Sequence, residues 1–255
     1  KFIDWRKIQL VKKRFLQLDT VSEKLIKLHP ADLAHIIEDL SVKEGGILMR
    51  SLDVKTAAHV MEEADVTFQK AFLRYLGPER AAPLLERIST DEVVDLLKLF
   101  SKKEARQFLT VLSPDKQEMV QDLLQYDDES AGGLMTTDYI VARPDWTVGE
   151  TMSHIKEFSH TMRSLFYVYI TDEHDVLKGM VSVRTLLIAD KQLPIGKIMK
   201  RIGHHATLRV HHKLNKMLKI MTRYNLNSAV VVDNKETLLG IVTIDDILRQ
   251  LYPSA

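Results

Sequence analysis

The chain has 255 residues, of which 45% are hydrophobic and 28% are charged, with a net charge of +1 and no cysteine. This length allows two domains, and the composition is ordinary for a soluble globular protein. The lack of cysteine excludes disulfides and thiolate metal sites, and the near-zero net charge gives no global sign of a nucleic-acid or anionic-membrane partner.

The beginning of the chain and its hydropathy set further expectations. No uncharged apolar run approaches the ~18–20 residues that a membrane span needs, and no signal peptide is visible. Because the chain begins at Lys1 rather than at methionine, we expect a piece of a longer protein. Residues 1–20 read as a short mixed segment with strand-like runs and a basic turn at residues 12–14. No further basic cluster supports a nucleic-acid patch, so we interpret this segment as a connector.

From Leu28 onward the sequence repeats with a period of twelve residues and no slip over eight copies. An apolar anchor opens each copy, at Leu28, Leu40, Leu52, Ala64, Leu76, Ile88, Phe100 and Leu112. A helix-start signal follows each anchor, at His29-Pro30, Ser41, Asp53, Asp65, Gly77-Pro78, Ser89, Ser101 and Ser113-Pro114. Serine and aspartate cap free N–H groups, and proline is tolerated in the first helical turn. The pattern therefore predicts one short helix per copy.

Each copy also carries the apolar stripe of an amphipathic helix, as at Val93, Leu96 and Leu97. Helices this short are not stable alone, so we expect them to stack into a superhelix that ends near Leu124. Pro83 falls inside one copy and is expected to kink or shorten its helix.

Two carboxylates on the predicted ladder, Asp91 and Asp95, are four residues apart and share one helix face. Such a pair can bind a divalent cation, or it can simply face water. Residues 126–136 then break the repeat with three acids followed by Gly132 and Gly133. A glycine pair marks a corner with exposed backbone, which is either a plain linker or a close approach to a ligand.

After this join the sequence contains two similar units, residues 134–190 and 198–251. Leu134 matches Ile198, Val148 matches Leu214, and Gly179 matches Gly240, at offsets of 64, 66 and 61. Each unit has the order β-α-β-β-α, with β-branched and aromatic strand runs. Two such units pack with pseudo-twofold symmetry and leave clefts between them. In each, a glycine and a short strand lead into a helix start, where anions bind.

The motif Gly-φ-φ-Ser/Thr-φ-x-Asp, with φ apolar, resembles that of paired cystathionine-β-synthase-type (CBS) domains. In that family the hydroxyl and the acid hold the phosphate and ribose of an adenine nucleotide. The second copy is complete with Thr243 and Asp246, whereas the first has Ser182 but Thr185 in place of the acid. The resemblance therefore implies one competent site for ATP or another adenine nucleotide.

The order of ladder, acidic Gly-Gly-Leu-Met-Thr join and CBS pair resembles the cytosolic region of the MgtE-type magnesium transporters across residues 25–252. The resemblance implies an α+β multidomain fold, with an all-α superhelix of twelve-residue repeats followed by a pair of α/β CBS domains. The expected segments are 1–23, an N-terminal extension or the end of a preceding domain; 24–126, the helical domain; 127–136, a linker; 137–192, CBS domain 1; and 193–255, CBS domain 2.

In that family these domains sense Mg²⁺, which binds between the helical domain and the CBS pair and holds a pore closed. The resemblance implies metal ligands at Asp91, Asp95, Gly132, Gly133, Asp190 and Asp246. Arg249 stands where the family often has another acid. The implied partners are a second copy, through the CBS pairs, and a membrane transport domain in cis or in trans, at the cytoplasmic face of the membrane; no nucleic acid is implied.

Two other hypotheses stay open. The chain can be a stand-alone soluble CBS regulator that binds an adenine nucleotide without a transport domain, or a structural scaffold without a small ligand. An enzyme is not expected, because the sequence contains no HExxH, no complete P-loop and no GxSxG. The histidine pairs at 204–205 and 211–212 lack the helical His-x3-His spacing or a cysteine that would complete a zinc site.

Overall fold

The computed structural model describes residues 28–158 and 165–251, so the segment at residues 1–20 lies outside the described residues. The chain divides into two compact units. One holds the described residues up to Ile88 together with Asp95–Ser113, and the other holds Ser89–Val94 together with the residues from Pro114 onward. No helix among the described residues is long and apolar enough to cross a lipid bilayer.

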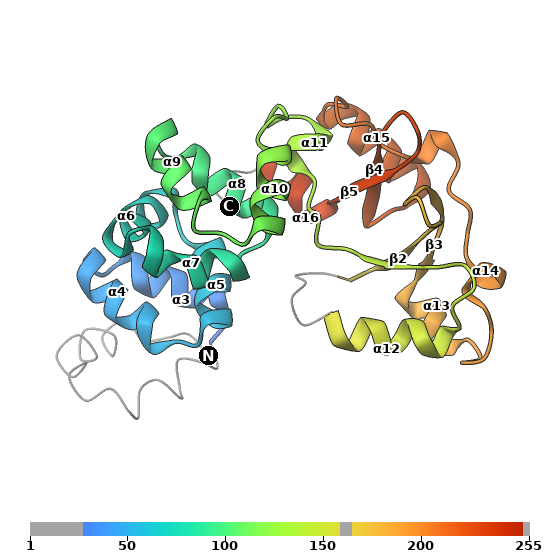
Figure 1. Cartoon of the computed structure of the whole chain (residues 1–255), viewed down its shortest axis with the longest axis horizontal. Helices are drawn as coiled ribbons and strands as arrows, with labels where there is room; N and C mark the ends of the chain where they lie inside the picture. The colour runs from blue at the N-terminus through green and yellow to red at the C-terminus, as the bar shows by residue number, and fades with distance from the viewer. Residues whose placement is uncertain (1–27, 159–164, 252–255) are drawn as a thin grey trace. The chain divides into compact units, whose positions relative to one another are not determined.

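The predicted ladder is present as a run of short helices (Figure 1). They are α3 (Pro30–Glu38), α4 (Val42–Ser51), α5 (Val54–Glu63), α6 (Val66–Leu76), α7 (Pro78–Arg87), α8 (Thr90–Lys98), α9 (Lys102–Leu109) and α10 (Pro114–Leu123). Each begins twelve residues after the one before, and the last ends one residue before Leu124. The period and the end of the ladder are therefore confirmed.

Side-chain caps explain where these helices begin. Ser41 and Ser101 form capping boxes with Glu44 and Glu104, in which each side chain bonds the other's backbone N–H. Asp53 accepts a hydrogen bond from the backbone N–H of Thr56 at 3.0 Å. Each cap satisfies donors that the first helical turn leaves open. The repeated serines and aspartates of the sequence thus set the start of the helices that they cap.

Within the helical unit each helix packs against the next but one, so that α3 lies on α5, α5 on α7, and α7 on α9. The apolar stripe is buried, with Leu33, Ile37 and Leu85 fully removed from water. Pro83 lies inside α7, which nevertheless runs for 10 residues. Of the expected kink or shortening, the shortening is wrong, because α7 is as long as α4 and α5, which also have 10 residues.

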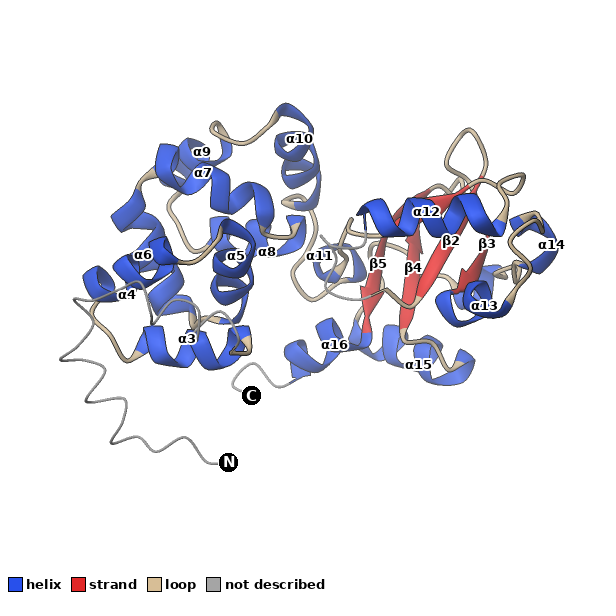
Figure 2. Cartoon of the chain, turned by 90° about the horizontal axis from the view of Figure 1, so that it is seen from below, coloured by secondary structure: helices blue, strands red, loops and turns tan. Residues whose placement is uncertain are grey.

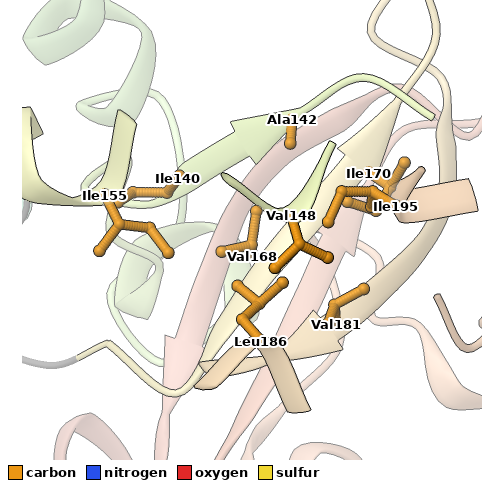
Figure 3. Close-up of a cluster of buried hydrophobic side chains, with 9 residues drawn as sticks. All are labelled: Ile140, Ala142, Val148, Ile155, Val168, Ile170, Val181, Leu186 and Ile195. Carbon is orange, nitrogen blue, oxygen red and sulfur yellow. The ribbon is translucent and has the colours of Figure 1, made fainter. Parts of the chain in front are cut away.

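The first α/β repeat contains β1 (Ile140–Ala142), α12 (Val148–Phe158), β2 (Tyr167–Thr171), β3 (Leu177–Ser182) and α13 (Val183–Ile188). Strand β2 is the centre of its sheet, parallel to β1 and antiparallel to β3. Figure 3 shows its core, in which side chains of the strands meet Val148 and Ile155 of α12 and Leu186 of α13. This is the predicted β-α-β-β-α order.

The second repeat contains α14 (Ile195–Ile198), the 3-10 turn η2 (His204–Ala206), α15 (Leu214–Tyr224), β4 (Ser228–Val232), β5 (Leu238–Thr243) and α16 (Ile244–Leu251). Strands β4 and β5 are antiparallel. The expected first strand is reduced to one parallel bridge between Leu208 and Val231. Figure 2 shows β5, β4, β2 and β3 side by side, and the buried Tyr169 of β2 packs against Val230 of β4.

The two repeats exchange short segments. Thr136, which precedes the first repeat, exchanges both backbone hydrogen bonds with Ile241 of the second, at 2.8 and 3.0 Å. Lys200, which lies after the first repeat, exchanges both backbone hydrogen bonds with Met180 of the first repeat, at 2.9 Å each. The short helices before these segments are α11 (Ala131–Leu134) and α14, at the predicted offset of 64 residues. The pseudo-twofold relation expected from the sequence is therefore present in the backbone.

Candidate functional site

The motif at residues 240–246 is a strand that ends in a helix cap. Oδ2 of Asp246 accepts hydrogen bonds from the backbone N–H and the hydroxyl of Thr243, at 2.8 and 2.7 Å. The backbone N–H of Asp246 donates to the Thr243 hydroxyl oxygen at 3.3 Å. This is the geometry of a capping box at the start of α16. Both of the hydrogen bonds that the carboxylate accepts end on Oδ2.

The twin motif in the first repeat has the same cap with different chemistry. The Ser182 hydroxyl oxygen accepts from the backbone N–H of Thr185 at 3.1 Å, and the two hydroxyls lie 2.7 Å apart. Thr185 therefore provides the hydrogen-bond partner of the Ser182 hydroxyl but carries no negative charge. Ser182 and Thr185 fit a neutral cap, whereas Thr243 and Asp246 leave an acid at the corresponding place.

The motif glycines let another chain segment cross the strand. A Cβ added at Gly240 would lie 2.9 Å from the carbonyl oxygen of Thr136, and one added at Gly179 would lie 2.5 Å from that of Lys200. These are the segments that the two repeats exchange. Both glycines are therefore explained by close backbone approach, without a ligand.

Asp246 is an acid of the second unit whose pKa is strongly raised. Burial raises its pKa to about 6 from an ordinary value of 3.8, and the hydrogen bonds from Thr243 oppose that rise. The negative charge of Asp91 raises the pKa further, and the positive charge of Arg249 lowers it. The guanidinium of Arg249 also lies 3.0 Å from Oε1 of Glu92. An acid beside another acid is an arrangement that a divalent cation would relieve.

The two predicted ligands on α8 have different surroundings. Asp91 is half-buried in the first turn of the helix and belongs to the same compact unit as Asp246. Asp95 is exposed and lies 3.5 Å from Nζ of Lys98, one turn later. A surface ion pair of this kind contributes little to stability. Asp91 is thus the member of the pair that the structure associates with Asp246.

Gly132 and Gly133 lie at the start of the two α/β repeats and not at an exposed corner. The backbone N–H of Gly132 donates to the carbonyl of Val210 at 2.9 Å, and that of Gly133 donates to Ser130 at 3.0 Å. A Cβ on Gly133 would lie 2.2 Å from the Asp127 carbonyl oxygen. Tight packing therefore explains the glycine pair, and only carbonyl oxygens remain there for a metal.

Asp190 is exposed in the turn after α13, where its carboxylate accepts from the backbone N–H of Gln192 at 2.9 Å. Within residues 28–158 and 165–251, no group of three or more His, Asp or Glu side chains is arranged to hold a metal ion. Of the predicted ligands, the structure associates only Asp91 with Asp246. All six predicted metal ligands, Asp91, Asp95, Gly132, Gly133, Asp190 and Asp246, stay predictions.

Two polar contacts were missed by sequence reasoning. The hydroxyl of Tyr169 lies 2.7 Å from that of Ser228, buried between the repeats. Nζ of Lys213 lies 2.6 Å from Oδ1 of Asp127, which fastens the acidic join to the second repeat. In both contacts the partners are far apart in the sequence, so no local pattern could have predicted them.

Comparison with known proteins places both halves in described families. The model of the MgtE intracellular N domain matches residues 28–129, and the CBS-domain model matches residues 131–191 and 195–253. The magnesium transporter MgtE of Thermus thermophilus is 30% identical over 236 residues, which are 91% of this chain and 52% of that protein. That of Bacillus subtilis is 26% identical and covers 87% and 49%. The chain thus spans about half the length of these relatives.

Solved structures agree over nearly the whole chain. The cytosolic domain of the Mg²⁺ channel MgtE in complex with ATP has a TM-score of 0.84 and 28% identity, covering 95% of this chain and 99% of that one. The soluble part of a magnesium transporter has a TM-score of 0.89 and 26% identity, covering 98% of each chain. The predicted fold class is confirmed. By these matches, the chain consists of an MgtE intracellular N domain followed by two CBS domains.

Proposed function

We propose that the chain is the Mg²⁺-sensing regulatory region of an MgtE-like magnesium transporter. It acts at the cytoplasmic face of the membrane on a transport domain joined to it in cis or bound in trans. The order of N domain and CBS pair supports this proposal, as do relatives named as magnesium transporters. No catalytic step is assigned to the chain.

The observation that carries the proposal is the relation between Asp91 and Asp246. The half-buried carboxylate of Asp246 has a raised pKa, to which Asp91 contributes through its charge. A Mg²⁺ ion near both would take the place of the proton. Mg²⁺ keeps most of its waters and binds through one or two carboxylates, so a pair without a full protein cage is adequate. We therefore expect Mg²⁺ to bind weakly, so that the occupancy of the site changes with the Mg²⁺ concentration, as a sensor requires.

The proposed mechanism is a two-state change. Without Mg²⁺ the acids repel and the helical domain separates from the CBS pair; with Mg²⁺ bound the two close and the pore is held shut. Control of this kind requires that the ion bind one state more tightly than the other. Asp95, Asp190 and the carbonyl oxygens of Gly132 and Gly133 are the further proposed ligands.

The test is a Mg²⁺ titration followed by calorimetry and small-angle scattering. Native protein should show saturable binding and a smaller radius of gyration with Mg²⁺. Asp246→Asn should lose both, whereas Asp245→Asn, which changes the exposed neighbouring acid, should keep both. An unchanged radius of gyration in native protein would sink the mechanism. Equal effects of the two variants would remove the assignment to Asp246.

A second candidate function is adenine-nucleotide binding by the CBS pair. A relative of similar structure was solved in complex with ATP, which favours it. The proposed contacts are Thr243 and Asp246, with Ser182 and Thr185 as the weaker twin. Calorimetry with ATP, ADP and AMP should give one site in native protein and a loss of binding in Asp246→Ala. No heat with any of the three nucleotides would remove this candidate.

We also propose that the chain forms a homodimer through its CBS pair. Leu187 and Ile188 of α13 are 67% and 82% exposed, and Leu248, the counterpart of Leu187 on α16, is 47% exposed. Exposed apolar side chains at matching places mark an interaction surface. Analytical ultracentrifugation should give a dimer for native protein and a monomer for the double variant Leu187→Glu, Ile188→Glu. A native monomer at all concentrations would contradict this.

A further inference from the structure

The net charge of +1 conceals an uneven distribution of charge along the chain. Residues 191–232 contain no aspartate and no glutamate. Their cations are Lys191, Lys197, Lys200, Arg201, Arg209, Lys213, Lys216, Lys219 and Arg223, accompanied by four histidines. Mg²⁺ binding does not call for so basic a segment, because a cation is repelled by lysine and arginine. It therefore needs an explanation of its own.

Within the part of the chain that the structure describes, some of these cations form ion pairs with acidic side chains, and others do not. Arg209 is paired with Glu236, and Lys213 with Asp127. Helix α15 buries Met217, Ile220 and Met221 and packs against β4. Three exposed cations therefore occupy its opposite side, Lys216, Lys219 and Arg223, with the i, i+3, i+7 spacing of one helix face. Among the described residues none of the three has an acidic partner.

The twin helix in the first repeat shows that the fold does not require this basic face. At the offset of 66 residues that aligns α12 with α15, Glu150 corresponds to Lys216, Ser153 to Lys219, and Glu157 to Arg223. All three α12 residues are exposed. The same scaffold thus presents two acids and a serine on one helix and three cations on the other. The cations are a property of α15 and not of CBS packing.

We propose that this basic face, defined as Lys216, Lys219 and Arg223, docks on the anionic surface of a lipid bilayer. The proposal rests on the proposed function in one respect, since a transport domain would hold the chain beside a membrane. Clusters of exposed lysine and arginine are attracted to anionic headgroups within about one Debye length, ~8–10 Å at physiological salt.

Two details favour lipid over other polyanions. Tyr224 ends α15, is 40% exposed, and lies with its ring centroid 5.9 Å from the Arg223 guanidinium carbon. A tyrosine beside cations is typical of residues at the headgroup level of a bilayer. Platforms for nucleic acid instead present several aromatic rings for stacking, and Tyr224 is the one aromatic residue of α15.

A second copy of the chain is a poor occupant of the basic face. A twofold contact places a surface patch against the same patch of its partner. Lys216, Lys219 and Arg223 would then meet their own counterparts, and like charges would repel. The apolar side chains proposed for the dimer lie on α13 and α16, so docking and dimerisation use different helices.

The test is sedimentation of the 255-residue chain with vesicles of phosphatidylcholine alone or mixed with phosphatidylglycerol, without Mg²⁺. We expect binding to the mixed vesicles only, weakened by added salt. The variant Lys216→Glu, Lys219→Ser, Arg223→Glu carries the α12 residues at equivalent positions, which the fold tolerates there. Each cation near an anionic leaflet strengthens binding roughly fivefold, so this variant should bind roughly 100-fold less tightly or worse.

A matched control changes three exposed cations of α9 in the same way, as Lys102→Glu, Lys103→Ser, Arg106→Glu. This control should keep vesicle binding, and thermal unfolding should show that both variants are folded. Failure of native protein to bind mixed vesicles, or equal losses in the two variants, would overturn the proposal. Binding of duplex DNA or RNA through the same three residues, without vesicle binding, would replace lipid by nucleic acid.

Mg²⁺ calorimetry on the α15 variant separates this proposal from the proposed function. We expect unchanged Mg²⁺ binding, because none of the three cations contacts Asp91 or Asp246. If native protein binds vesicles but not Mg²⁺, the proposed function fails and the docking surface stands. If it binds Mg²⁺ but not vesicles, the docking surface fails alone.

Discussion

The hydroxyl oxygen of Tyr169 lies 2.7 Å from that of Ser228, and both side chains are buried. Tyr169 is in the centre of β2 and Ser228 opens β4, so this hydrogen bond joins the two CBS repeats. Burial raises the pKa of Tyr169 far above its ordinary value, which keeps the phenol neutral and able to donate. The bond is therefore present throughout the physiological pH range.

Removing this hydrogen bond should destabilise the CBS pair. Tyr169→Phe deletes one hydroxyl without changing the ring, and Ser228 is then buried without its partner. We expect a loss of about 1–3 kcal/mol in the free energy of unfolding, the cost of an unsatisfied buried polar group. Urea unfolding of both single variants and of Tyr169→Phe, Ser228→Ala measures it. If the double variant loses the sum of the single losses, the two hydroxyls do not interact.

Gly133→Ala should be far more harmful than Gly203→Ala. A Cβ at Gly133 would lie 2.2 Å from the Asp127 carbonyl oxygen, whereas one at Gly203 meets nothing within 4 Å. Backbone must shift to relieve such an overlap, at a cost of about 1–3 kcal/mol. Thermal unfolding compares the two variants directly. Equal midpoints would mean that the join is not packed as described.

Asp246→Asn should raise the melting temperature at pH 7.5. The pKa of Asp246 is raised to about 6 in the folded chain from 3.8, so the folded state binds this proton more tightly than the unfolded state. Stability contributed by the group is therefore present at low pH and lost as pH rises through about 6. Asparagine keeps an acceptor for Thr243 without the buried charge.

The pH dependence distinguishes this explanation from a general effect of the substitution. The gain in melting temperature from Asp246→Asn should shrink as the pH falls from 7.5 to 5, because the native acid is then increasingly protonated. Asp245→Asn, at the exposed neighbouring position, should give no such trend. A gain of the same size at both pH values would contradict a raised pKa.

Asp53→Ala should cost about 1 kcal/mol at pH 7, the usual value for loss of an N-cap. Hydrogen bonds from Thr56 lower the pKa of Asp53 below 3.8, so its contribution is present above that pH and is lost as the pH falls further. Denaturant unfolding at pH 7 and pH 3 should therefore show a smaller loss at pH 3. Asp53→Asn, which keeps a capping oxygen, should lose little at pH 7.

The ladder could be predicted because each repeat carries its own signals. An apolar anchor and a capping serine or aspartate recur at every twelfth residue, and local capping needs no knowledge of distant contacts. The CBS pair was predictable for a related reason, since its two copies could be aligned with each other. The reduction of the second repeat's first strand to a bridge at Leu208 had no such local signal.

The candidate site was harder to read because its residues serve two purposes. The Thr243 and Asp246 motif is a helix cap, and Gly240 is required by the crossing of Thr136, so these residues would be needed even without a ligand. Of the charged groups that shift the pKa of Asp246, Asp91 comes from a distant part of the sequence. The basic face of α15 was missed because the net charge sums over acidic and basic regions.

The exchange of Thr136 and Lys200 between the repeats limits how the molecule can be divided. A cut between residues 192 and 193 would leave the first repeat without the segment that pairs with Met180, and the second without the one that pairs with Ile241. Each fragment would expose an open strand edge. The CBS pair is thus a single folding unit despite its two copies. A displacement of the join at residues 126–136 would reach the second repeat through the backbone hydrogen bonds between Thr136 and Ile241.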